Sequence, residues 1–218
     1  DIRLTGAERR RLEAELAEEI TILWQTDEVR SARPRVVDEI RQGLWFLEES
    51  LWDAAPELVA EWRRRLPGVP LRFGSWIGGD LDGNPNAGVE TVREAVERAH
   101  GVVVRLLRRD IRALAASWGM STTLVGADPA VGDVALPSEL NTDEPYRRRL
   151  TSLWERLGAD EIVDGDELRA ELELIDRSLR ANAGGRIADG GLADLILRLD
   201  VFGLHGVTLD VRVHSRAL

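Results

Sequence analysis

Apolar side chains recur every three to four residues along most of this chain, which is the spacing of one face of an α-helix. The pattern predicts helices over residues 5–30, 34–66, 89–118, 144–157, 166–182 and 191–202. Thr5 and Glu8 have the spacing of a capping box at the start of the first helix, and Pro56 is expected to bend or break the second. The apolar stripe of the first helix is Leu12, Leu16, Ile20 and Leu23, and that of the third is Val92, Val96, Ala99, Val103, Leu107, Ile111 and Leu114.

Two short stretches have strand character instead. Residues 71–77 are mainly apolar, and residues 207–214 alternate between aliphatic and polar side chains, which is the period of a β-strand. Helices occupy most of the chain between the two strands. The sequence therefore predicts a mostly α protein with a few short parallel strands, in a helix-rich α/β scaffold. The whole chain, residues 1–218, is expected to be a single segment of a larger domain. Within it we distinguish a helical pair (1–66), a strand, glycine loop and long helix (67–120), a loop (121–143), a group of helices (144–206) and a strand (207–218).

The polar face of the second strand carries the first candidate chemistry. Asp210 and Arg212 share that face, so the carboxylate can hold the guanidinium in position. An arginine presented in this way suits a phosphate or a carboxylate, because its planar fork donates two hydrogen bonds. A solvent-exposed strand edge explains the same pattern without any ligand.

The stretch FGSWIGGDLDGNPNA, residues 73–87, is the second candidate. Gly78, Gly79 and Gly83 permit positive φ angles and close backbone approach. Asp80 and Asp82 can bind a divalent cation, cap the next helix or hold an arginine. The D-x-D-G-N order is that of a calcium loop, but the twelfth position is a threonine where such loops have a glutamate. A tight structural turn is the alternative.

Composition narrows the classes of function. The net charge of −10 disfavours nucleic acid as a partner, and no apolar run reaches the length of a membrane helix. The chain has no cysteine, which excludes disulfides and thiolate metal sites and fits a cytoplasmic protein. It has no lysine, so no Schiff base forms here. Because residue 1 is not methionine, the chain is expected to be an excerpt or a processed piece of a longer protein.

Five segments in order resemble the phosphoenolpyruvate carboxylase family. FGSWIGGDLDGNPNA is similar to the family's F-G-S-W-[IM]-G-G-D-R-D-G-N-P-N. EEITILWQTDEVR and PRVVDEIRQGLWFLEESLWDAAPE resemble its L-W-Q-T-[DE]-E and S-L-W-D-[AV]-[VL]-P stretches. NTDEPYRRRLTSLWERL resembles its E-P-Y-R helix, and FGLHGVTLDVRVHSRAL its F-G-L-x-L-x-x-L-D-[IV]-R-Q-x-S strand. The likeness extends over nearly the whole chain.

The resemblance implies a lyase that adds bicarbonate to phosphoenolpyruvate, through carboxyphosphate and an enolate, and replenishes oxaloacetate for the tricarboxylic acid cycle. It implies Mg²⁺ or Mn²⁺ held by ligands outside this segment, an eight-stranded α/β barrel containing the two strands, and an allosterically controlled cytoplasmic homotetramer. Arg212 would grip the transferring phosphate, and Asp210 would hold Arg212. The substrate-binding residues would be Trp76, Gly78, Gly79, Asp80, Asp82 and Asn84.

The sequence departs from the family pattern at three positions. Leu81 replaces an arginine, Val213 replaces a glutamine, and Gly206 interrupts an aliphatic run. The family's T-A-H-P-T-E motif and glycine-arginine loop are not in the chain, so these 218 residues alone are expected not to catalyse. The rival hypothesis is a truncated, inactive homologue that serves as a helical binding or assembly module. A calcium-binding protein built on residues 80–86 is a third.

Overall fold

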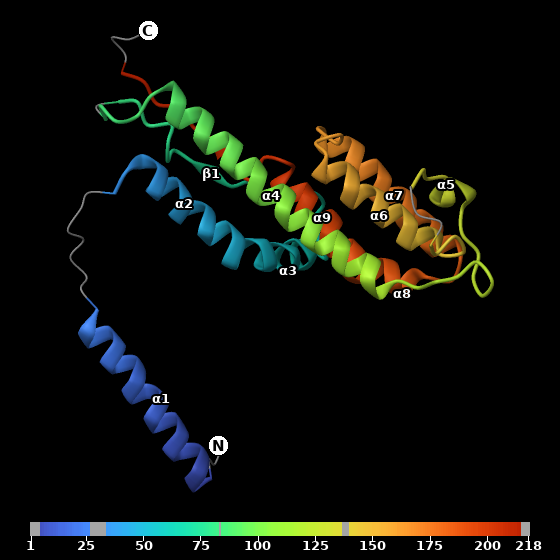
Figure 1. The fold of residues 1–218 in the computed structure, drawn as a ribbon, viewed down its shortest axis with the longest axis horizontal. Coiled ribbons are helices and arrows are strands. Elements are labelled where there is room, and N and C mark those ends of the chain that lie inside the picture. Colours follow the sequence, from blue (N-terminus) through green and yellow to red (C-terminus); the bar gives the residue numbers. More distant parts are fainter. Residues whose placement is uncertain (1–4, 27–33, 83, 137–139, 215–218) are drawn as a thin grey trace. The chain divides into compact units, whose positions relative to one another are not determined.

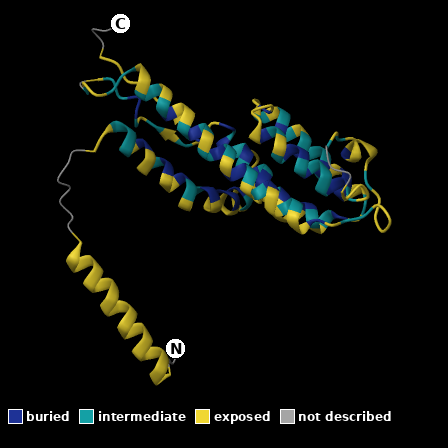
Figure 2. Cartoon of the chain, in the orientation of Figure 1, coloured by how far each residue is buried: buried dark blue, intermediate teal, exposed yellow. Residues whose placement is uncertain are grey.

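A computed structural model describes residues 5–26, 34–82, 84–136 and 140–214. The chain divides into two units, residues 1–34 and 35–218. In the first unit, α1 (Gly6–Gln25) starts with the predicted capping box: Thr5 Oγ1 accepts from the main-chain N–H of Glu8, and the Glu8 carboxylate accepts from the N–H of Thr5. No residue of α1 is buried, so its apolar stripe is exposed, as the uniform colour of this helix in Figure 2 shows.

The second unit is a packed group of helices (Figure 1). In chain order, its helical elements are α2 (Val36–Phe46), the π-helical turn η1 (Leu47–Leu51), α3 (Trp52–Arg63), α4 (Val89–Ser117), α5 (Pro129–Gly132), α6 (Pro145–Gly158), α7 (Gly165–Ala181), α8 (Gly185–Ile187), the π-helical turn η2 (Ala188–Leu192) and α9 (Ala193–Phe202). Its two strands are β1 (Gly74–Ser75) and β2 (Thr208–Leu209).

Pro56 does not break the second predicted helix, contrary to one of the two sequence-based expectations. A proline inside a helix leaves the carbonyl four residues before it without its usual N–H donor. Here that carbonyl belongs to Trp52, and Nε of Arg198 from α9 donates to it across 3.0 Å. The side chain of a distant helix thus satisfies the group that Pro56 leaves open, and the wider turn η1 lies just before α3.

The core forms around α4, the longest helix, which packs against α2 and α6. Its predicted stripe is confirmed at Ala99, Val103, Leu107 and Ile111, all of them buried. Val96 belongs to the same predicted stripe, but it is 51% exposed. Near the middle of the unit, the ring of Phe202 is stacked between those of Trp52 and Phe73, with centroid distances of 5.0 and 5.3 Å. These rings join α9, α3 and the segment that leads into β1.

The two strands pair in parallel, with Gly74 opposite Thr208 and Ser75 opposite Leu209. The predicted mostly α fold with short parallel strands is therefore confirmed. Both strands are shorter than the sequence pattern predicted, although an isolated bridge between Asp80 and Arg212 continues the pairing. The aliphatic face of the second strand packs on helices at Val207 and Leu209, whereas Val211 and Val213 are exposed. No helix among the described residues is long and apolar enough to span a membrane.

Candidate functional site

The glycine loop and the end of the second strand are joined by main-chain hydrogen bonds. Past the paired residues of β1 and β2, the N–H of Arg212 donates to the carbonyl of Gly79 across 2.9 Å. The carbonyl of Arg212 accepts from the N–H of Leu81 at 2.8 Å. Because parallel strands end on the same side, these bonds hold the loop and the arginine together at the carboxyl ends of both strands.

Two glycines make this close approach possible. A Cβ on Gly79 would overlap the carbonyl oxygen of Asp210, so only a residue without a side chain fits between the two backbones. Gly78 has a φ of +91°, and a Cβ there would lie 2.9 Å from Cβ of Ala95. The sequence-based expectation of a positive φ is met at Gly78, and that of close backbone approach is met at Gly79. Gly83, which was included in the same expectation, lies outside the described residues.

The guanidinium of Arg212 pairs with Asp80, whose Oδ2 lies 3.8 Å from Nη1. This is the single ion pair that Arg212 makes with the described part of the chain, so Asp210 does not hold it as the strand pattern suggested. Oδ2 of Asp210 instead lies beside Gly74. The Arg212 side chain remains 60% exposed, and Oδ1 of Asp80 is buried without a hydrogen-bond partner among the described residues.

The other predicted site residues lie in the same loop with different surroundings. Trp76 is 61% exposed, and its carbonyl accepts from the N–H of Gly79 at 2.9 Å, so Trp76 begins the turn that leads into the glycine pair. Oδ1 of Asn84 accepts from the N–H of Asn86 at 3.0 Å, which closes a local turn. Asp82 is exposed. The structure thus brings Gly79 and Asp80 to Arg212, and Trp76 lies at the turn that leads into the glycine pair.

Sequence reasoning missed one residue that fixes the loop. Oγ1 of Thr91, in the first turn of α4, lies 3.0 Å from the carbonyl oxygen of Gly78 and 2.9 Å from the N–H nitrogen of Gly88. Thr91 therefore ties both ends of the loop to the start of α4. Its position after a glycine, at the beginning of an amphipathic stretch, is the helix-start signal that could have identified it.

The described residues do not by themselves fit a divalent metal. They contain no group of three or more histidine, cysteine, aspartate or glutamate side chains placed to hold an ion. Asp80, the first ligand position of the calcium-loop alternative, is paired with an arginine.

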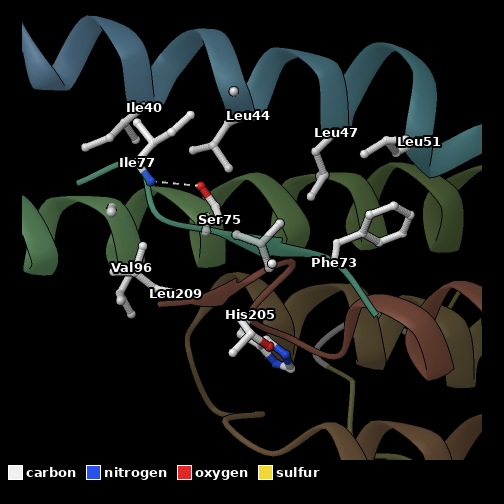
Figure 3. Close-up of a pocket in the computed structure, with 16 residues that line it drawn as sticks. Ile40, Leu44, Leu47, Leu51, Phe73, Ser75, Ile77, Val96, His205 and Leu209 are labelled. Atoms are coloured by element: carbon white, nitrogen blue, oxygen red, sulfur yellow. Dashed lines mark hydrogen bonds between the residues drawn. The ribbon is translucent and has the colours of Figure 1, made fainter. Parts of the chain in front are cut away.

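An apolar hollow lies apart from these polar side chains. It has a volume of about 560 Å³ and lies between α2, α4 and the strands (Figure 3). Ile40, Leu44 and Ile77 supply much of its lining, and the main-chain N–H of Ile77 donates to Oγ of Ser75 at 3.1 Å. Trp76, Asp80 and Arg212 do not line it, so we regard this hollow as packing space beside the strands and not as the site.

Comparison with known proteins identifies the family. The family model for phosphoenolpyruvate carboxylase matches residues 1–161 and 141–218, which together include the whole chain. The chain belongs to the phosphoenolpyruvate carboxylase family. The resemblance read from the five motifs is confirmed by this match.

Curated members of the phosphoenolpyruvate carboxylase family align with almost all of the chain. It is 38% identical to the phosphoenolpyruvate carboxylase of Ectopseudomonas mendocina (strain ymp) over 97% of its length, and 39% identical to that of Pseudomonas putida F1 over 96%. The enzyme of Nocardia farcinica is 37% identical over 96% of the chain. In each case the chain spans 26% of the relative's own length, so it corresponds to about a quarter of such an enzyme.

Proposed function

We propose that this chain works as part of a phosphoenolpyruvate carboxylase, in which Arg212 binds the phosphate that is transferred between phosphoenolpyruvate and bicarbonate. The proposal depends on one observation: main-chain hydrogen bonds connect Gly79 and Leu81 of the glycine loop to Arg212. This joining leaves the guanidinium exposed at the carboxyl ends of two parallel strands. In α/β barrels, catalytic groups lie at that end of the strands.

The chemistry follows from the side chains. The guanidinium of Arg212 can donate two parallel hydrogen bonds to phosphate oxygens, and its charge offsets negative charge that develops during phosphoryl transfer. Asp80 restricts where the guanidinium points. In this proposal the exposed indole of Trp76 would form one wall of the site, and the loop of Gly78 and Gly79 would bring main-chain groups close to a bound substrate.

The remaining features of the enzyme are part of the same proposal. The two strands would belong to an eight-stranded α/β barrel, completed by segments beyond this chain. The Mg²⁺ or Mn²⁺ of the family would be held by residues outside it, because the described residues do not fit a metal. The parent would be a cytoplasmic, allosterically controlled homotetramer that supplies oxaloacetate to the tricarboxylic acid cycle, and the 218 residues alone would not catalyse.

The test is made in the complete protein that contains this chain. Oxaloacetate formation from phosphoenolpyruvate and bicarbonate is measured for the unaltered protein and for Arg212→Ala, which should reduce turnover on the order of 100-fold or more. Arg64→Ala is the matched control, because Arg64 is an exposed arginine just after α3 that pairs with the nearby Glu61. Equal turnover in both variants would remove Arg212 from the site. Absence of activity in the unaltered protein would favour the inactive homologue.

A further inference from the structure

We infer that α4 and α6 form a second anion-binding site, separate from Arg212, that takes a small molecule bearing carboxylate or phosphate groups. The site is an open hollow of about 570 Å³ on the second unit. Its lining consists of Gly101, Val104, Arg105, Arg108, Arg109, Arg112 and Trp154. All charged residues of this lining are arginines, although the chain as a whole carries a net charge of −10.

The four arginines lie on one face of α4. Their positions follow the i, i+3, i+4, i+7 spacing, which places side chains in a single row along a helix. Two of them are neutralised by neighbouring carboxylates. Nη2 of Arg105 lies 2.6 Å from Glu48, and Nε of Arg109 lies 2.9 Å from Asp110.

The other two have no carboxylate partner in the described part of the chain. Nε of Arg108 donates to the main-chain carbonyl of Trp154 at 3.1 Å, and its Nη groups make no hydrogen bond with the described residues. The Arg112 guanidinium lies over the Trp154 ring and makes no hydrogen bond or ion pair with the described residues. Two positive charges are thus left without a counter-charge on a protein that otherwise pairs many of its arginines within its own fold.

Trp154 gives these guanidiniums a defined position. The Arg108 Cζ lies 4.2 Å from the centroid of the indole, and that of Arg112 lies 5.6 Å from it. A guanidinium held against an aromatic face keeps the N–H groups at its edge available to acceptors. Gly158, at the end of α6, leaves room for the Arg108 guanidinium, which would collide with a Cβ at that position. The arrangement lowers the entropy that each side chain loses when it binds a ligand.

The spacing of the two groups indicates the size of the ligand. Side chains four residues apart on a helix have Cβ atoms about 6 Å apart. That separation suits one phosphate or a short dicarboxylate, bound by two arginines at once through charge-assisted hydrogen bonds. A dissociation constant on the order of 1 mM is expected for such a small anion at an exposed site.

The indole N–H resonances of ¹⁵N-tryptophan-labelled chain test this inference, with Trp154→Phe to assign the reporter. Inorganic phosphate and succinate are titrated separately at constant ionic strength. Either probe should shift the Trp154 resonance saturably, and the one that binds more tightly identifies the ligand class. Trp76 serves as an independent reporter for the Arg212 site, so the two proposals fail or succeed separately.

Variants then assign the binding to the arginines. Arg112→Ala should weaken the titration of Trp154 tenfold or more, and Arg112→Lys should lie between it and the unaltered chain, because lysine keeps the charge but loses the fork. Arg64→Ala removes the same charge elsewhere and should change nothing. Circular dichroism checks that each variant is folded. No saturable shift of Trp154 below about 10 mM of either probe, or equal weakening in Arg112→Ala and Arg64→Ala, would overturn the site.

Discussion

The main-chain N–H of Arg212 donates a hydrogen bond to the carbonyl oxygen of Gly79 across 2.9 Å. The two residues are more than half the chain apart in sequence. The bond places an exposed guanidinium beside a loop that has no side chain at its point of closest approach. The candidate site therefore depends on backbone contact first and on side-chain chemistry second.

Gly79→Ala tests that backbone contact. A Cβ at residue 79 would overlap the carbonyl of Asp210, and main-chain atoms yield less readily than the end of a flexible side chain. We expect the free energy of unfolding of the 218-residue chain to fall by about 1–3 kcal/mol in urea titrations. The control is Gly101→Ala in the middle of α4, where nothing lies within 4 Å of the new Cβ. That variant should gain about 0.5–1 kcal/mol, because alanine favours a helix. Equal midpoints for the two variants would contradict the packing argument.

Asp80→Asn and Asp210→Asn, made in the complete protein, decide which carboxylate positions Arg212. The structure pairs the arginine with Asp80, at 3.8 Å, and the pair is partly exposed. A partly exposed ion pair is worth about 0–1 kcal/mol, so Asp80→Asn should raise the KM for phosphoenolpyruvate by up to about fivefold with a smaller change in kcat. Asp210→Asn should have a weaker effect on KM. A larger effect of Asp210→Asn would restore the arrangement that the strand pattern predicted.

Asp110→Asn tests the polar network beneath α3. The Asp110 carboxylate accepts from the indole N–H of the fully buried Trp52 at 2.8 Å and from Nη1 of Arg198 at 3.1 Å. An amide removes the charge that both donors share, so the free energy of unfolding should fall by about 1–3 kcal/mol. Asp189→Asn is the control, because Asp189 forms an exposed pair with Arg180 and should change stability by no more than about 0.5 kcal/mol. Similar unfolding midpoints would show that the network adds little.

The capping box of α1 makes a pH-dependent prediction. Hydrogen bonds from the main chain and then the side chain of Thr5 lower the pKa of Glu8 below its ordinary value. Because the pKa of Glu8 is lowered in the helix, its hydrogen bonds with Thr5 stabilise the helix fully when the pH is above the ordinary glutamate pKa. This stabilisation is lost as the pH falls through the lowered pKa of Glu8. In Thr5→Ala, the pKa of Glu8, followed by NMR titration of its side-chain carbons, should rise toward the ordinary value. An unchanged pKa would mean that the box does not form in solution.

The sequence alone determined the longer helices and where several of them begin, but not the short α5 and α8. A capping box acts over three residues, so Thr5 and Glu8 predict the start of α1 without knowledge of the rest of the chain. The apolar spacing of α4 reflects a single face turned to a core, and four of its predicted positions are buried. The five motifs sufficed to identify the family, because ordered matches of that length are specific.

Only the tertiary structure decided which groups meet. Alternation along one strand placed Asp210 and Arg212 on the same face, but it does not encode that the glycine loop brings Asp80 to the guanidinium. The same limit explains Pro56, since the donor that satisfies the Trp52 carbonyl comes from α9. It also explains why the sequence did not predict the anion-binding role that we propose for Arg112, since in the sequence this residue is one more arginine on a charged helix face. Periodicity records which side of an element is buried, whereas a hydrogen bond, an ion pair or a ring contact depends on the partner that the fold brings within a few ångströms.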